Sequence, residues 1–329
     1  MCTSMAMPGK TFCFGRNLDL ECGFGERVAL TPRGCPLEFK RLGKLENHYA
    51  ILGMAAMRGE TALYADAFNE KGLCIAGLNF PEDAVYCRDV PKNQRAVAPH
   101  ELPLWLLGRC ATLRQAKEEL SRLTLADSPF DEETPCTPMH WHIADETGSA
   151  VLEATREGMR VWENPANVLT NSPPFDFQML HLRQYLNVTA DEPISRFADA
   201  LTLEPFGRGM GAAGLPGDYS PPSRFVRAAF VLANGGRIPE GCDRVLHFFH
   251  LLEAVAMPYG SVMTQAGPEY TRYSCCMTQG TYIYKTYDSC RMTAIDMFKE
   301  DLDGAKPVVF EAAGSRQMQR QGSAESCRA

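Results

Sequence analysis

Short apolar runs separated by turn residues predict several antiparallel strands. Residues 47–80 contain three such runs, divided by Arg58-Gly59-Glu60 and by Asn69-Glu70-Lys71-Gly72. This spacing predicts consecutive antiparallel strands. A second hairpin is predicted from residue 139 to residue 163. The run from Met139 to Ala144 forms its first strand, residues 145–148 form the turn, and residues 149–163 form the returning strand.

The C-terminal third adds more strand signal. Residues from Tyr270 to Met297 are rich in Tyr and Thr, which favour strands, and we expect two or three strands there.

Helical periodicity marks the segments between these strands. From Pro103 to Leu123 the chain predicts a helix whose apolar face is formed by Leu113, Ala116, Leu120 and Leu123. Residues from Phe175 to Leu186 predict a second helix after the breaker Ser172-Pro173-Pro174.

Two more helices are expected after a loop. Residues from Gly207 to Gly217 hold five glycines and predict irregular structure. Pro221-Pro222-Ser223 then begins a helix, with Ser223 as its cap, that ends near Gly235-Gly236. The residues from Cys242 to Met257 are apolar on nearly every face, which predicts a buried helix.

Strands in antiparallel clusters with helices grouped between them favour an α+β layered fold over a doubly wound one. Neither an internal repeat nor a Pro- or Ser-rich linker divides the chain, so we expect a single domain over residues 2–315. Residues 316–329 lose all periodicity and predict a disordered tail.

Composition narrows the class of protein. The 329 residues are 45% hydrophobic and 22% charged with a formal net charge of −7, which is ordinary for a globular protein and argues against a nucleic-acid partner or a membrane surface. The 13 cysteines form no C-x-x-C pair. The sequence also has no signal-peptide pattern and no run of about 18 apolar residues. The cysteines are therefore expected to be reduced thiols in a cytoplasmic protein.

Several familiar sites are not favoured. His140 with His142, and His247 with His250, could converge, but neither pair has a Cys or carboxylate at ligand spacing, so we expect structural histidines and no metal. The glycine-rich GRGMGAAG lacks the Lys-Ser/Thr of a phosphate loop, and no G-x-S-x-G elbow is present. We expect no cofactor.

Cys2 can carry a different chemistry. Methionine is normally removed before a small residue, and removal of Met1 would leave a cysteine with both a thiol and a free α-amine. The amine has a pKa of about 7.7–8.0, so one residue supplies a nucleophile and a base. A chance cysteine in a cysteine-rich chain is the alternative.

Arg16 and Asp19 strengthen the case for Cys2. A hairpin between residue 2 and the segment FGRNLD would bring a cation and a carboxylate beside it. The arginine would favour the thiolate, and the aspartate could orient the amine. A surface ion pair is the alternative reading of these two residues.

Seven motifs in register resemble the choloylglycine (bile salt) hydrolases, relatives of the penicillin V acylases among the N-terminal nucleophile hydrolases. They are Cys2 after Met1, FGRNLD at 14–19, NEKGL at 69–73, AGLNFP at 76–81, LTNSP at 169–173, LPGDYSPPSRF at 215–225 and AIDM at 294–297. The resemblance implies a four-layer α-β-β-α sandwich and cleavage of a linear amide bond.

The resemblance also implies residue roles. Cys2 would be the nucleophile, with Arg16 and Asp19 lining it. Asn79 and Asn171 would help to form the oxyanion site, although each could be an ordinary turn residue, and Arg224 would complete the polar network. An apolar cleft for the steroid would be lined by a further set of residues: Leu18, Ala65, Phe130, Thr134 and Met139. Each of these could also be plain core.

Conjugated bile salts are the expected substrates, because Asn79 resembles the bile salt hydrolases, whereas many penicillin V acylases carry Tyr there. A penicillin V acylase, an N-acyl amino acid amidase or amine transfer from the thioester remains the alternative within the class. A non-catalytic binding protein or a redox thiol protein is the alternative from another class. The resemblance further suggests a homotetramer.

Two departures from the family pattern leave questions open. The interval between Cys2 and Arg16 is shorter than usual, which shortens the first hairpin. Arg58 stands in a loop where relatives often carry an aromatic residue. That cation could attract an anionic conjugate or could simply be solvated.

Overall fold

The computed structural model describes residues 1–9, 11–236, 238, 241–289 and 291–311. Within them, two antiparallel sheets stack face to face. The seven-stranded sheet has the order β14-β1-β2-β16-β17-β18, with β15 beside β16, and the eight-stranded sheet has the order β13-β12-β11-β8-β7-β6-β3-β19. The predicted tail at residues 316–329 lies outside the described residues.

The strands of the first sheet are β1 (Cys2–Met7), β2 (Cys13–Leu20), β14 (Val168–Leu169), β15 (Val262–Thr264), β16 (Gly267–Thr278), β17 (Thr281–Thr286) and β18 (Thr293–Asp296). Those of the second are β3 (Arg27–Thr31), β6 (Ile51–Arg58), β7 (Thr61–Asn69), β8 (Cys74–Asn79), β11 (Met139–Asp145), β12 (Gly148–Thr155), β13 (Gly158–Glu163) and β19 (Val308–Phe310). Two small pairs, β4 (Leu37–Phe39) with β5 (Gly43–Leu45) and β9 (Ala96–Val97) with β10 (Thr124–Leu125), complete the set.

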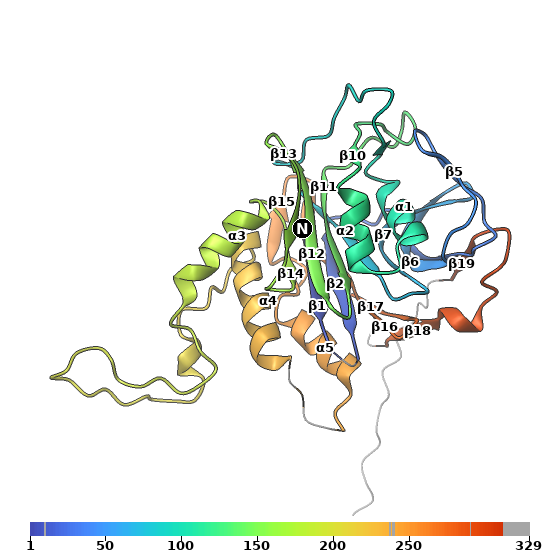
Figure 1. Cartoon of the computed structure of the whole chain (residues 1–329). Helices are drawn as coiled ribbons and strands as arrows, with labels where there is room; N and C mark the ends of the chain where they lie inside the picture. The colour runs from blue at the N-terminus through green and yellow to red at the C-terminus, as the bar shows by residue number, and fades with distance from the viewer. Residues whose placement is uncertain (10, 237, 239–240, 290, 312–329) are drawn as a thin grey trace, which may run out of the picture.

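Helices cover the outer face of each sheet (Figure 1). Helices α1 (Leu102–Arg109) and α2 (Leu113–Leu120) lie on the second sheet, and α3 (Phe175–Leu182), α4 (Pro221–Gly235) and α5 (Arg244–Glu253) lie on the side of the first. The short 3-10 turns are Arg183–Tyr185, Met210–Ala212 and Met297–Lys299. The expected four-layer α-β-β-α sandwich is confirmed.

Apolar side chains fill each of the three spaces between these layers. One cluster of buried residues spans the space between the sheets and the space under α4 and α5, and includes Phe14, Leu78 and Phe248. A second cluster fills the space under α1 and α2, around Trp105 and Trp141. Side chains of alternate residues on each strand therefore enter different layers.

Most predicted elements are present. The three strands in residues 47–80 are β6, β7 and β8, and the Tyr- and Thr-rich segment forms the three strands β16, β17 and β18. The returning arm of the second hairpin is two strands rather than one, because the turn at residues 156–157 separates β12 from β13.

Three helix predictions need correction. The helix expected from Pro103 to Leu123 is two helices, since Cys110 is extended and Thr112 caps α2 by accepting a hydrogen bond from Gln115 N. Ser220, and not Ser223, occupies the N-cap position of α4. The fifth helix is not buried on every side, because Leu246 is exposed.

The chain between α3 and α4 extends away from the body of the molecule (Figure 1). Apart from two short 3-10 turns, Arg183–Tyr185 and Met210–Ala212, it is irregular, as the glycines of residues 207–217 predict. Among the described helices, none is both long and apolar enough to cross a bilayer.

Candidate active site

Cys2 is the first residue of β1, and both of its backbone polar groups are held by side chains from distant parts of the chain. Its amide nitrogen donates to Asn171 Oδ1 at 2.9 Å, and its carbonyl accepts from Arg224 Nη1 at 2.5 Å. The Cys2 side chain is buried. The position of the thiol is therefore fixed through its own backbone.

Asn171 and Arg224 form the centre of this arrangement. Arg224 Nη2 donates to Asn171 Oδ1 at 2.7 Å, and Arg224 also binds Thr3 Oγ1 at 2.6 Å and the carbonyl of Tyr219 at 2.9 Å. Asn171 Nδ2 donates to the Asn79 carbonyl at 2.7 Å, which leaves a second N–H on that amide nitrogen. The loop after β14, the start of α4 and the end of β8 therefore meet at Cys2.

Arg16 lies on the same face of the sheet as Cys2. The register pairs Cys2 with Leu18 and Ser4 with Arg16, so these four side chains point toward the second sheet. Arg16 Nη1 donates to the Gly77 carbonyl at 2.6 Å and to that of Ala65 at 3.3 Å. Its Nε and Nη2 are buried and make no hydrogen bond with any described residue, so two donor groups remain available beside the thiol.

Burial opposes the Arg16 charge, but neighbouring Cys2, Tyr273 and Asp66 outweigh that effect and raise its pKa. Asp66 lies 3.9 Å from Arg16 and is fully buried. Its carboxylate accepts from Tyr273 at 2.5 Å and from Tyr282 at 2.6 Å. The Asp66 carboxylate thus offsets the positive charge of Arg16. No local sequence pattern predicted this role.

Asp19 lies beside the start of β1, but its side chain is on the opposite face of β2 from that of Arg16. It lies three positions after Arg16, and an odd separation along a strand places the two side chains on opposite faces. Its Oδ1 accepts from Thr271 at 2.6 Å, and its Oδ2 is buried without a hydrogen-bond partner in the part of the chain that the structure describes. Burial raises the pKa of this carboxyl group, against the opposing charge of Arg224.

Met1 continues strand β1 in this structure. Asp19 N donates to the Met1 carbonyl at 3.0 Å, and the Met1 ammonium donates to the Asp19 carbonyl at 2.8 Å and pairs with Glu269. Burial lowers the pKa of that ammonium group. The nitrogen of residue 2 is still part of a peptide bond here.

Three of the five predicted cleft residues pair with or contact other predicted site residues, and the other two lie in a separate loop. Leu18 is the strand partner of Cys2, Ala65 provides a carbonyl to Arg16, and Met139 is the strand partner of Asn79. Phe130 and Thr134 close a tight loop, in which Phe130 N donates to the Thr134 carbonyl at 3.0 Å.

Arg58, at the exposed end of β6, reaches Thr134 Oγ1 at 3.4 Å. The cation therefore touches the loop that carries two of the expected cleft residues.

The two histidines of β11 are buried. His142 shares hydrogen bonds with Ser4 Oγ at 2.8 Å and with Asn164 Nδ2 at 3.2 Å, and burial lowers its pKa to about 3. His140 lies between Glu153 and the carbonyl of Thr170. Among the described residues, no group of three or more metal-binding side chains is assembled.

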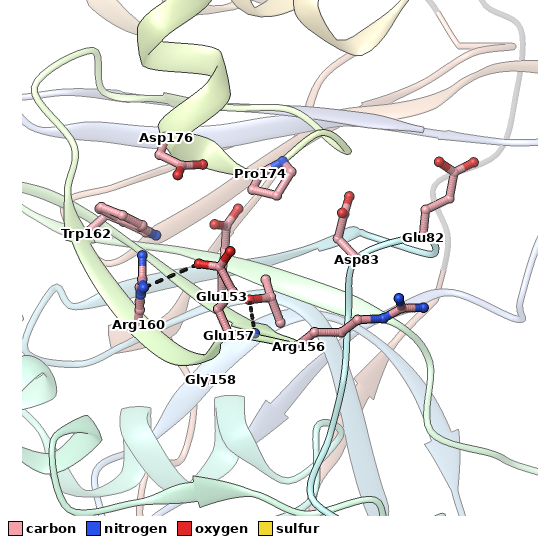
Figure 2. A pocket seen from close by; sticks show the side chains of 11 residues that line it. Glu82, Asp83, Glu153, Arg156, Glu157, Gly158, Arg160, Trp162, Pro174 and Asp176 are labelled. Atoms are coloured by element: carbon pink, nitrogen blue, oxygen red, sulfur yellow. Dashed lines mark hydrogen bonds and ion pairs between the residues drawn. The ribbon is translucent and has the colours of Figure 1, made fainter.

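A cavity of about 340 Å³ adjoins the loop that follows Asn171. Figure 2 shows Glu153, Pro174 and Asp176 beside it, with Glu82 and Asp83 on another side. Glu82 and Asp83 follow the motif that contains Asn79, so the cavity borders both asparagine-bearing segments.

Comparison with known proteins finds bile salt hydrolases among the relatives of this chain. A bile salt hydrolase/transferase from Lactiplantibacillus plantarum is 40% identical over 313 residues, covering 94% of this chain and 96% of the relative. A bile salt hydrolase/transferase from Clostridium perfringens is 38% identical, covering 92% of this chain and 94% of the relative.

Solved structures give the same picture. A variant of the conjugated bile acid hydrolase from Clostridium perfringens superposes with a TM-score of 0.88 at 35% identity, covering 97% of this chain and 99% of that one. Penicillin V acylase from Agrobacterium tumefaciens has a TM-score of 0.72 at 22% identity, with 93% and 90% covered, and shares the fold. The model of the linear amide C–N hydrolases, choloylglycine hydrolase family, matches residues 2–310, and the chain belongs to that family.

Proposed function

We propose that this enzyme hydrolyses the amide bond of glycine- or taurine-conjugated bile salts, with Cys2 as the nucleophile. The observation that carries the proposal is the convergence of Asn171 and Arg224 on the backbone of Cys2, with Arg16 on the face of its thiol. Membership of an amide hydrolase family, and the conjugated bile salt activity printed in the names of its relatives, support the substrate class.

The reaction begins after Met1 has been removed. The free α-amine of Cys2 then takes the position of the present amide nitrogen, 2.9 Å from Asn171 Oδ1. The amine accepts the thiol proton, and the nearby Arg16 cation favours the thiolate. Asp19 lies at the same end of the strand, where its buried carboxyl group, bound by Thr271, can orient the free amine.

The thiolate attacks the amide carbonyl carbon, and negative charge develops on the carbonyl oxygen. The Asn79 side chain and the remaining N–H of Asn171 Nδ2 donate to that oxygen. Loss of one such donor lowers kcat by about 10²–10³-fold in other acyl-transfer enzymes. The Cys2 ammonium protonates the leaving nitrogen as the C–N bond breaks, which releases glycine or taurine and leaves a thioester.

Water then attacks the thioester carbon, with the Cys2 amine accepting its proton. The C–S bond breaks, the thiol is restored and the free bile acid leaves. An amine that took the place of this water would give acyl transfer by the same steps.

The steroid would lie against the apolar residues Leu18, Ala65 and Met139, with the loop of Phe130 and Thr134 above it. Arg58 holds that loop through Thr134 Oγ1 at its exposed edge. We expect its cation to attract anionic substrates to the cleft.

Paired rate measurements test the substrate class. Purified enzyme, with removal of Met1 verified by mass, is assayed for kcat/KM on glycocholate, taurocholate and penicillin V. We expect both bile salts to exceed penicillin V by at least about tenfold, or about 1.4 kcal/mol of transition-state binding. A clear preference for penicillin V would assign the enzyme to the acylases. No turnover of any of the three would contradict amide hydrolysis of this class.

We further propose a homotetramer in the cytoplasm. The segment between α3 and α4 presents exposed apolar side chains to solvent, among them Ile194, Phe197 and Phe206. Such a surface on an extended arm fits contact with another copy of the chain.

A further inference from the structure

His140 lies between the two segments that carry Asn79 and Asn171. Its ring stacks on that of Phe80, the residue after Asn79, with centroids 4.2 Å apart and planes 9° apart. Its Nε2 lies 3.1 Å from the carbonyl of Thr170, the residue before Asn171. One fully buried side chain therefore touches the immediate neighbours of both asparagines.

The hydrogen-bond partners of His140 fix where its protons lie. A backbone carbonyl can only accept, so Nε2 must carry a hydrogen and donate it to Thr170. Nδ1 lies 3.0 Å from Glu153 Oε1, and one proton lies between them. The ring is thus held in a single orientation at both nitrogens.

Glu153 ties the same loop at a second point. Its two oxygens accept from Phe175 N at 3.0 and 3.2 Å, which fixes the start of α3 just beyond Asn171. Glu153 is 2% exposed, at the edge of the cavity that also meets Pro174 (Figure 2). Gln178 adds a third tie, since its Nε2 donates to the carbonyls of Asn171 and Pro173.

We propose that His140, held by Glu153, is a positioning residue that sets the two asparagine-bearing segments relative to each other in the catalytic geometry. The inference rests on the proposed function, in which Asn79 and Asn171 act on the developing oxyanion. A shift of about 1 Å between such groups can lower a rate about 100-fold. His140 itself touches neither the nucleophile nor the substrate.

His142 offers a matched control on the same strand and the same face. It is equally buried, but its partners Ser4 and Asn164 lie outside the asparagine-bearing segments. Asn164 Nδ2 also donates to the Val168 carbonyl, so it presents a donor to His142 Nε2. His142 therefore carries its proton on Nδ1, the opposite arrangement from His140.

The kinetic test compares His140→Phe with His142→Phe on glycocholate. Phe at 140 keeps an aromatic ring against Phe80 but cannot bind Thr170 or Glu153. We expect kcat to fall about 10–100-fold with KM within about threefold, because the loss acts on transition-state charge. His142→Phe should keep kcat within about threefold of wild type. Equal kcat losses in the two variants, or an unchanged kcat in His140→Phe, would overturn the proposal.

A second pair of variants keeps the test valid if His140→Phe does not fold. In Glu153→Gln the amide can donate to His140 Nδ1 and accept from Phe175 N, so we expect kcat within about threefold of wild type. Glu153→Leu has a similar shape and neither bond, so kcat should fall at least about tenfold further. Equal rates in the two variants would count against the role of His140.

Nitrogen NMR of histidine-labelled wild-type enzyme is independent of turnover. The expected result is a protonated Nε2 in His140 and a protonated Nδ1 in His142, and a bare Nε2 in His140 would refute the contact with Thr170. The two ideas fail separately. Absence of wild-type turnover removes the proposed function, whereas normal wild-type turnover with unaffected variants removes only the role of His140.

Discussion

At the scale of single residues, Cys2, the proposed nucleophile, is held by its backbone rather than by its side chain. Asn171 Oδ1 accepts from both Cys2 N and Arg224. Arg224 in turn donates to the Cys2 carbonyl, so Asn171 and Arg224 together fix the backbone of residue 2. The side chain of Cys2 takes no part in these hydrogen bonds. Its chemistry can therefore be removed without disturbing the position of the strand.

We expect Cys2→Ala to abolish hydrolysis, by at least about 10³-fold in kcat, because no other group supplies the acyl-accepting sulfur. The melting temperature and the circular dichroism spectrum should remain close to those of wild type. Cys110→Ala is the control, since Cys110 is a buried thiol at the end of α1, far along the chain from this site. Measurable turnover by Cys2→Ala would contradict the thioester mechanism.

Retention of Met1 should have the same effect for a different reason. With Met1 in place the nitrogen of residue 2 is an amide, which cannot act as a base at neutral pH. Enzyme made with an N-terminal extension should therefore be inactive while folded, and enzyme with the same extension at the C-terminus should be active. Intact mass and the rate on glycocholate, measured on the same samples, check this. Full activity of the extended protein would show that the α-amine is not needed.

The sequence was informative about some of these residues and silent about others. It predicted Arg16 and Asp19 as site residues, and strand parity alone would have placed their side chains on opposite faces. Asp66 and His140 could not be assigned partners, because Tyr273 and Thr170 are far along the chain and no local pattern links them. Buried polar contacts of this kind depend on the packing of two sheets.

At the scale of elements, the strands were predictable and the helix boundaries were not. Alternation and turn residues mark β6, β7 and β8 without reference to the rest of the chain. The break between α1 and α2 depends on a tertiary contact, because Asp145 Oδ2 accepts from Leu113 N at 2.7 Å at the start of α2. Helical periodicity continues across this break, so the sequence alone predicted one helix.

Glu70 links elements in a way that makes stability depend on pH. It lies in the turn after β7, accepts from Ala50 N at 2.9 Å and binds Arg33 through both oxygens. The Arg33 guanidinium lowers the pKa of this carboxyl group. Because the pKa is lower in the folded state, the ionised carboxyl group stabilises the fold at any pH above the ordinary glutamate pKa of about 4.3. That stabilisation is lost as the pH falls through the folded-state pKa.

Glu70→Gln should therefore lower the free energy of unfolding by about 1–2 kcal/mol near pH 7, with Arg33 partly exposed to solvent. The difference from wild type should shrink as the pH falls below about 4.3, the ordinary pKa of a glutamate, and vanish once the pH lies below the lowered pKa of the folded state. Thermal melts from pH 3.5 to 7.5 measure it. Glu118→Gln, in an exposed helical pair with Arg114, should change little at any pH. A Glu70→Gln deficit that is constant with pH would refute the assignment.

At the scale of the whole molecule, the arm between α3 and α4 is the least self-contained part of the described chain. Phe206 is 94% exposed and Phe197 78% exposed, although both are large apolar side chains. The sheets need no contribution from this segment, since every described strand of both lies outside it. Its apolar side chains fit a partner surface.

Replacing Phe197 and Phe206 together by Ser should lower the oligomeric state. We expect light scattering to give fourfold the chain mass of 36.4 kDa for wild type and a smaller multiple for the double variant. Leu246→Ser changes an exposed apolar residue of α5 and should leave the mass unchanged. A double variant with the wild-type mass would show that the arm does not join the copies.

The position of β1 in its sheet limits when Met1 can be removed during synthesis of the chain. The strand pairs with β2, which follows it closely in the chain, and with β14, which is synthesised far later. Until the loop of Asn171 and helix α4 emerge from the ribosome, little covers the end that begins with Met1. Once they are in place, the Met1 ammonium is bound by the Asp19 carbonyl and Glu269. We therefore expect Met1 to be removed before these segments have been synthesised and folded. Chains that fold with Met1 still in place should be folded but inactive.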